Sequence, residues 1–163
     1  SGITVQRVNI HTCDNCIQAT VATITDSYLH APLYFDGAHV DMILDEGGDG
    51  PFVVRHNTVI NTYGQTSAVA LFQDDAVVRN ATVEDNRLGG GGYTIYGGAR
   101  SRGQSSGIVV RGNRFLRAGS GGGVFGPVAY FEPSAPGNVW QDNVWDDDGQ
   151  LVQPLLTNLA WLR

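Results

Sequence analysis

One motif returns four times along the sequence, as VRHNTV (54–59), VEDNRL (83–88), VRGNRF (110–115) and WQDNVW (140–145). Its Asn recurs at intervals of 29, 27 and 30 residues. Two earlier stretches, ITDSYL (24–29) and VQRVNI (5–10), fit the same template with Ser27 and Val8 in the Asn position. A period of this length predicts a solenoid of about six coils, because one such unit cannot bury its own apolar face and must stack on its neighbours.

Each unit reads as short strands with no helix. Apolar residues lie three and then two positions apart across the motif, which indicates a strand, a bend at Asn and a second strand. A third strand-like run follows in most units, as DMIL (41–44), SAVALF (67–72), YTIY (93–96) and PVAYF (127–131). Short strands in units of this length predict an all-β parallel β-helix. Six rungs of about 4.8 Å would make it roughly 30 Å long.

The recurring Asn has a structural explanation. Asn tolerates left-handed backbone torsions more easily than other non-Gly residues, so we expect it to form a corner of each coil. Stacked amides can also hydrogen-bond from coil to coil as an Asn ladder. Two positions before each Asn, we expect Arg55, Glu84 and Arg111 to point outward and to pair across neighbouring strands.

With these residues in view, the chain resembles the right-handed parallel β-helix proteins of the pectin-lyase-like superfamily over roughly residues 3–152. The segments GGGGYTIYGG (89–98) and GNVWQDNVWDDDG (137–149) are similar to repeat proteins of high-GC bacteria and their phages. This resemblance implies a right-handed β-helix that is extracellular or displayed on a virion, for example in a phage tail. It says little about activity, because the scaffold carries lyases, hydrolases, esterases and non-catalytic adhesins.

We expect residues 1–152 to form the β-helix and residues 153–163 to leave the repeat. The apolar stretch LVQPLLTNLAWLR (151–163) predicts a cap over the last coil or an oligomer contact, such as a homotrimer. Because the first coil strand begins at Ile3, an uncapped coil would expose its core and its strand edges. We therefore expect upstream residues of a larger parent protein, or another chain, to cover that end.

The charge of the chain limits the classes of partner that it can bind. The chain has no Lys, ten basic and sixteen acidic residues, and a formal charge of −6. It shows no basic stripe of the kind that nucleic-acid binding requires, so we expect no nucleic-acid partner. It shows neither a long apolar run nor a basic amphipathic segment, so we expect no membrane partner. A neutral cell-surface glycan fits this charge best, whereas an anionic polysaccharide would need a bridging cation.

The two cysteines form the segment CDNC, as Cys13 and Cys16. Zinc sites normally need four ligands, and His11 with His30 one coil later could complete a set. A local disulfide in an exported protein and a pair of buried free thiols are the alternatives. Of these, the disulfide is the interpretation that we favour.

The densest polar segment is LHAPLYFDGAHVDMILDEGGDG (29–50). His39 and Asp41 lie two residues apart, so in an extended segment they project to one side and could act as a catalytic acid and base. Asp41, Asp45 and Glu46 could bind a hard cation such as Ca²⁺. The alternative is a solvated loop whose Asp and Gly residues form turns. Loops on rigid scaffolds often carry sites, which keeps the functional interpretation open.

The sequence does not show the catalytic residues that enzymes of this family use. Family lyases use Arg or Lys as the base beside clustered Asp, and the acidic segment contains neither. Family hydrolases place Asp residues on successive coils. Here Asp26, Asp85 and Asp142 precede the corner position, but His56 and Gly112 separate them. We therefore find no glycosidase carboxylate pair.

Tyrosines provide a binding alternative. Five aromatic residues lie in or beside the third strand of two adjacent coils, between Gly-rich segments: Tyr93, Tyr96, Phe125, Tyr130 and Phe131. If alternate members face outward, they would form a platform on which sugar rings stack, whereas the members that face inward would pack in the core. The sequence therefore predicts a non-catalytic carbohydrate-binding β-helix, with a polysaccharide lyase or glycoside hydrolase as the alternative. No cofactor other than a possible Ca²⁺ ion is expected.

Overall fold

The computed structural model describes residues 2–98, 101–119 and 121–154, in which every regular element is a β-strand. The strands form three parallel sheets. Sheet A contains β1 (Ile3–Gln6), β4 (Ala22–Thr25), β7 (Phe52–Arg55), β10 (Ala81–Glu84), β13 (Val109–Arg111) and β16 (Val139–Gln141). Sheet B contains β2 (Asn9–Ile10), β5 (Tyr28–Leu29), β8 (Thr58–Asn61), β11 (Arg87–Gly90), β14 (Arg114–Phe115) and β17 (Val144–Trp145). Sheet C contains β3 (Ile17–Gln18), β6 (Asp41–Asp45), β9 (Ser67–Leu71), β12 (Tyr93–Gly97) and β15 (Gly126–Ala129).

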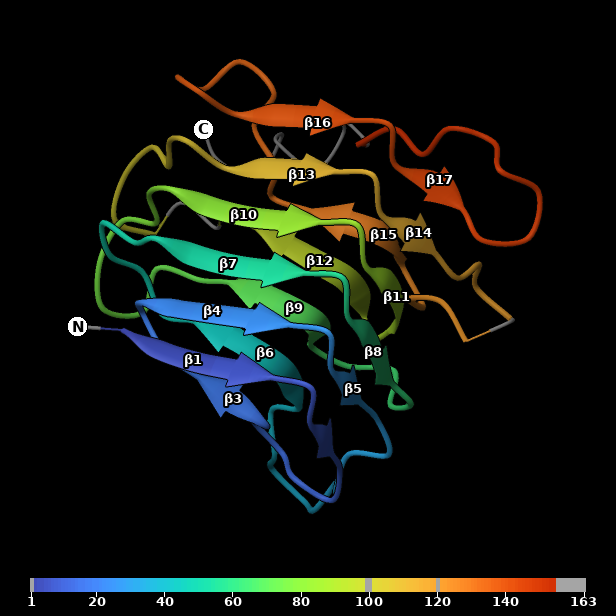
Figure 1. Cartoon of the computed structure of the whole chain (residues 1–163). Coiled ribbons are helices and arrows are strands. Elements are labelled where there is room, and N and C mark those ends of the chain that lie inside the picture. Colours follow the sequence, from blue (N-terminus) through green and yellow to red (C-terminus); the bar gives the residue numbers. More distant parts are fainter. Residues whose placement is uncertain (1, 99–100, 120, 155–163) are drawn as a thin grey trace.

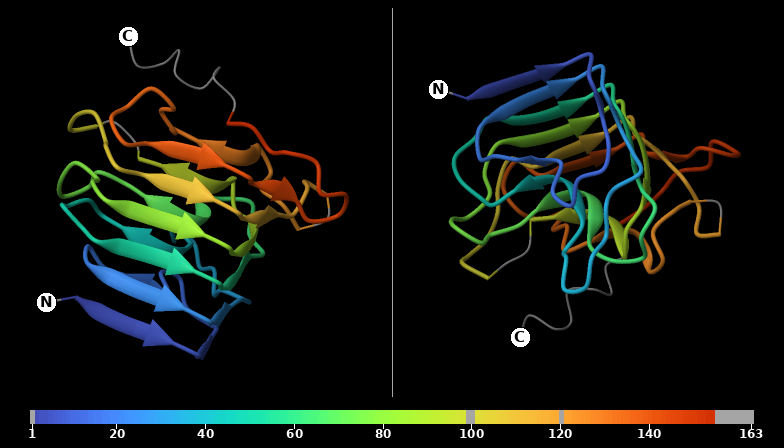
Figure 2. Two further views of the ribbon diagram at one scale, coloured as in Figure 1. Left: turned by 45° about the horizontal axis from the view of Figure 1, so that its top comes forward. Right: turned by 90° about the horizontal axis from the view of Figure 1, so that it is seen from below.

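The chain passes from sheet A to sheet B to sheet C and then returns to sheet A one rung higher. In Figure 1 the strands of sheet A run left to right in front, sheet C lies behind them, and the chain climbs from the N-terminus at the bottom. This is the right-handed sense of winding. The two further views show the same stack from other sides (Figure 2). The predicted all-β parallel β-helix is therefore confirmed.

About four coils, β4 to β15, bury apolar side chains in all three sheets. Across sheet C, for example, Ile43, Val69, Ile95 and Val128 stand in register and are at most 2% exposed. The coils at the two ends are less enclosed, because Val5 and Trp140 are only partly buried. The sequence predicted about six coils, whereas about four are fully enclosed. The first and last turns have a neighbouring coil on one side only.

The Asn ladder is confirmed at the corner between sheets A and B. The backbone N–H and the side-chain amide of Asn57 both donate to Oδ1 of Asn86, at 2.9 and 3.1 Å. Asn86 does the same to Asn113, and Asn113 to Asn143. Ser27 continues the ladder by donating its N–H to Oδ1 of Asn57 at 2.9 Å. All four Asn residues are at most 3% exposed, so these bonds satisfy amides that would otherwise be buried without partners.

The expected backbone role of Asn is wrong. The left-handed residue is the one before each Asn, with φ of 57° at His56, 55° at Asp85, 65° at Gly112 and 52° at Asp142. That residue turns the chain, and the Asn after it directs its side chain into the coil. Hydrogen bonding, and not torsional tolerance, therefore explains the Asn.

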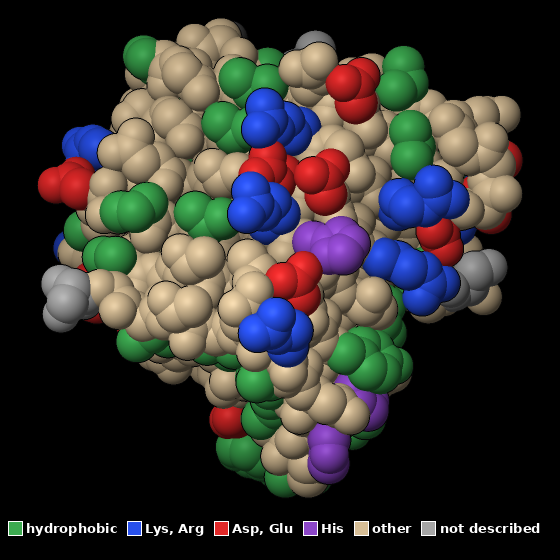
Figure 3. Space-filling view, in the orientation of Figure 1, with side chains coloured by type: hydrophobic (Ala, Val, Ile, Leu, Met, Phe, Trp, Pro, Cys, Tyr) green, Lys and Arg blue, Asp and Glu red, His purple; other side chains and the backbone are tan. Residues whose placement is uncertain are grey.

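The outward row on sheet A pairs as predicted. Glu84 stands in register with Arg55 on one side and Arg111 on the other. Its carboxylate lies 3.6 Å from Arg55 Nη1 and 2.7 Å from Arg111 Nη2. Alternating signs of charge thus join three neighbouring coils on this face (Figure 3).

The last described residues fold back over the stack. Leu151 forms an antiparallel bridge with Val144, and Val152 is 2% exposed within the core cluster. The predicted cap or oligomer contact at 153–163 falls almost wholly on residues 155–163, which lie outside the described residues.

Candidate functional site

Five aromatic rings gather on three neighbouring coils of sheet C and the segments beside its strands. We call Phe72, Tyr93, Tyr96, Phe125 and Tyr130 the aromatic cluster. Tyr96 is its centre, with ring centroids 4.9 Å from Phe72, 5.7 Å from Tyr93 and 5.8 Å from Tyr130. Tyr93 also contacts Phe125 at 5.7 Å. The structure thus brings together all three tyrosines predicted to bind carbohydrate.

The rings form a faceted surface and not one flat row. Tyr96 and Tyr130 are nearly parallel at 23°, whereas Tyr93 meets Tyr96 edge-on at 78°. The three tyrosines are half-buried, and Phe125 is the most open ring at 65% exposure. Burial raises the pKa of the Tyr96 phenol to about 12, with smaller contributions from Tyr130 and Asp41, so at neutral pH it is a neutral donor and acceptor.

The backbone at Tyr130 is unusual. Its φ is 56°, in the left-handed region that a bulky side chain rarely adopts. Such a conformation costs roughly 1–2 kcal/mol and is kept only where the surroundings determine it. Here it places Tyr130 beside Tyr96, while the next residue, Phe131, is 4% exposed and packs on Trp140 in the core.

Asp41 lies near this cluster at the start of β6. Its carboxylate accepts a hydrogen bond from Ser67 Oγ at 2.5 Å and is 2% exposed. Burial raises the pKa of Asp41 to about 6, against the lowering effect of the Ser67 hydrogen bond and of nearby His39. His39 itself is exposed in the loop before β6. The Asp41 carboxylate is thus hydrogen-bonded to Ser67, and His39 affects it only through its charge, so the expected acid–base pair is not hydrogen-bonded.

The expected cation ligands do not converge. Asp41 and Asp45 lie at opposite ends of β6, four residues or about 13 Å apart. Asp45 Oδ1 accepts the N–H of Gly47 at 2.9 Å, and Glu46 accepts a bond from Gln18 at 2.7 Å. Across the part of the chain that the structure describes, no three His, Cys, Asp or Glu side chains are grouped to share a metal ion.

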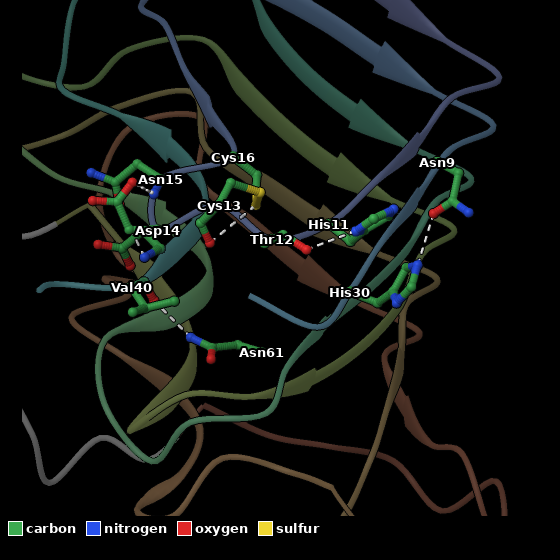
Figure 4. The surroundings of a disulfide bond; sticks show 11 residues. Asn9, His11, Thr12, Cys13, Asp14, Asn15, Cys16, His30, Val40 and Asn61 are labelled. Carbon is green, nitrogen blue, oxygen red and sulfur yellow. Dashed lines mark hydrogen bonds between the residues drawn. A yellow bond between two sulfur atoms is a disulfide. The ribbon is translucent and has the colours of Figure 1, made fainter. Parts of the chain in front are cut away.

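Cys13 and Cys16 form a disulfide, as we favoured from the sequence (Figure 4). Their sulfurs are therefore not thiolate ligands for zinc. His11 and His30 are neighbours on adjacent coils, with ring centroids 5.5 Å apart, but each ring is held by a polar partner: Thr12 for His11 and Asn9 for His30 (Figure 4). Within the same segment, Asn15 Oδ1 accepts the N–H of Asp41 at 3.1 Å and so fixes the start of β6.

A concavity of about 730 Å³ follows the corner between sheets A and B, on the side seen in Figure 3. Several of the charged groups that line it are already paired. Asp26 accepts bonds from His56 at 2.8 Å and Gln6 at 3.0 Å, and the His56 bond, followed by the Gln6 bond, lowers the pKa of Asp26. Arg87 and Arg114 both bind Asp146. A general acid for glycoside cleavage needs a raised pKa, so Asp26 does not fit that role.

Sequence reasoning missed three aromatic residues. Phe72 ends the run SAVALF, where it was read only as part of a strand. Tyr34 and Tyr63 belong to separate loops, yet their rings lie 5.2 Å apart. The sequence did contain one indication of their proximity: both loops come just before a strand of sheet C, as does the segment that contains Phe125.

The chain matches no protein-family model, no curated protein sequence and no solved structure. In the described residues there is also no helix long and apolar enough to cross a membrane. The structure therefore shows the architecture, a parallel β-solenoid, and the family is supported by the sequence resemblance alone.

Proposed function

We propose that this chain is a non-catalytic carbohydrate-binding β-helix of the pectin-lyase-like type, and that the aromatic cluster is its glycan site. The observation that carries this proposal is the gathering of five rings with Tyr96 at their centre, in which contacting centroids are 4.9–5.8 Å apart. Aromatic faces with polar edges suit sugars, which present apolar C–H faces and hydroxyl rims.

The negative charge of the chain favours a neutral glycan as the ligand. The chain carries a formal charge of −6, and Asp41 lies close enough to Tyr96 to affect its pKa. A polyanion would be repelled there, whereas the hydroxyl groups of a neutral sugar can bond to the phenols. The Cys13–Cys16 disulfide is typical of an oxidising compartment, which supports an extracellular or virion-displayed protein.

The test is binding of the purified protein to a panel of neutral and acidic polysaccharides, with Ca²⁺ and with chelator, followed by mass analysis of the sugars. Phe125→Ala removes the most exposed ring and should change stability by no more than about 0.5 kcal/mol. We expect this variant to weaken glycan binding about fivefold, or about 1 kcal/mol.

Tyr28→Ala is the matched control, because Tyr28 is also exposed, at 44%, but stacks on His30 at the outer side of sheet B. Equal loss of binding in both variants would contradict the assignment to the cluster. Shortened or unsaturated sugars would instead favour a lyase or hydrolase, and Asp41→Asn would then be the variant to assay for turnover.

A further inference from the structure

The loops between sheets B and C form a ladder of their own. Gly91 N–H donates to Tyr63 O at 3.0 Å, and Gly92 N–H to Thr66 O at 2.9 Å. One coil higher, Val124 N–H donates to Gly91 O at 3.0 Å, and Phe125 N–H to Gly92 O at 2.7 Å. Three loops that are far apart in sequence are thus joined rung to rung, with the Gly-rich segment in the middle.

A second pair of rings lies further along this corner. Tyr34 and Tyr63 have centroids 5.2 Å apart, and Tyr34 is 44% exposed. Their loops are tied together by side chains that donate to the backbone: Asn61 to Val40 O and Gln65 to Ala38 O, both at 2.6 Å (Figure 4 shows the first). Rings held this way lose little entropy when a ligand binds.

A hollow of about 190 Å³ lies at this corner, between Tyr63 and Val124, the residue before Phe125. Tyr63 and Val124 lie on its rim, and Gly64, Gly90, Gly121 and Gly122 leave it open. A Cβ on Gly90 would lie 1.4 Å from Asn61 O, so this corner requires glycine. Among the described residues that line the hollow, none carries a charge. A hollow of this composition favours an uncharged ligand.

We infer that the ligand is an oligosaccharide that lies along the solenoid axis, from the Tyr34–Tyr63 pair across the hollow to the aromatic cluster. This rests on the proposed function and adds the form of the ligand: a neutral glycan chain several sugars long. Tyr34 belongs to the coil of β6 and Phe125 to the coil of β15, three rungs away. At about 4.8 Å per rung, Tyr34 and Phe125 are about 14 Å apart along the axis, more than one sugar ring can span.

The experiment is isothermal titration with graded neutral oligosaccharides, from disaccharide to hexasaccharide, of the α-1,4-glucan, β-1,4-glucan and β-1,4-mannan series. For a series that binds, we expect affinity to rise with length and then to level off once the chain reaches the second pair. Tyr34→Ala should leave the disaccharide unchanged and weaken the hexasaccharide about tenfold, which corresponds to 1.4 kcal/mol.

Tyr28→Ala is again the control, because Tyr28 and Tyr34 are both 44% exposed. Tyr63→Ala, with folding checked by circular dichroism, should reproduce the effect of Tyr34→Ala. If disaccharide and hexasaccharide bind equally, or if Tyr34→Ala weakens both alike, the extended ligand is wrong while the glycan site stands. If no member of any series binds, the proposed function fails as well.

Discussion

Replacing Asp41 by Asn should change how the stability of the protein depends on pH. Asp41 and Asp45 are each 2% exposed, and burial raises the pKa of each to about 6 from an ordinary value near 3.8. In the unfolded chain both would lose their protons near pH 4. Between about pH 4 and pH 6 the folded protein therefore holds more protons than the unfolded one.

The sign of the effect follows from this difference. When the folded state binds more protons, the free energy of unfolding falls as pH rises, by about 1.4 kcal/mol per pH unit for each group. Over about two units this amounts to roughly 3 kcal/mol for Asp41 and a similar amount for Asp45. The stabilisation is complete below pH 4 and is lost by about pH 7. Relative to a typical total of 5–15 kcal/mol, this is a large change.

The assay is urea unfolding of wild type and of Asp41→Asn from pH 4 to pH 8. Asn keeps an oxygen that accepts the Ser67 hydroxyl but carries no charge. We expect the variant to gain about 3 kcal/mol relative to wild type between pH 4 and pH 7. Asp36→Asn changes an exposed residue of the loop before β6 and serves as the control. Parallel pH profiles for wild type and Asp41→Asn would refute the reasoning.

Three further changes test the scaffold and its corners. Asn86→Ala leaves Val54 O and the Asn57 amides without their buried partner, so we expect chemical denaturation to show a loss of about 3 kcal/mol or more. Gly90→Ala places a Cβ 1.4 Å from a backbone oxygen at φ 82°, and thermal unfolding should show a loss of about 4 kcal/mol or more, or no folded protein. Reducing the Cys13–Cys16 disulfide, which closes a short loop, should lower the free energy of unfolding by about 2 kcal/mol, measured by urea unfolding with and without reductant.

The repeating part of the molecule could be predicted from the sequence because its causes are local and recur. The positions of Asn57, Asn86, Asn113 and Asn143 indicated the stacking register directly, and the structure places them in one ladder. What the pattern could not show was which residue takes the left-handed conformation. His56 and Asp85 occupy it, and His and Asp, like Asn itself, adopt positive φ more often than other non-Gly residues, so residue type alone did not single out one position.

The candidate site was only partly predictable for a different reason. Tyr93 and Tyr96 share a strand but are three residues apart, and a regular strand would put them on opposite faces, so their contact could not be read from spacing. Asp41 was placed with His39 because the two are close in sequence, but its partner in the fold is Ser67, 26 residues away on the next coil. Tyr34 and Tyr63 are brought together in the same manner. Contacts across coils depend on loop lengths, which a motif does not encode.

The two kinds of corner in each coil differ in how much their length varies. Between sheets A and B every corner has the same length of two residues, as at 7–8, 56–57 and 112–113. Between sheets B and C the connection varies from two residues at 91–92 to eleven at 30–40. A corner of constant length keeps the Asn side chains in register and cannot change without breaking the ladder. The variable corner is free of that constraint, and it carries Tyr34, Tyr63 and Phe125. Binding specificity on this scaffold should therefore change through the B–C loops while the Asn corner stays fixed.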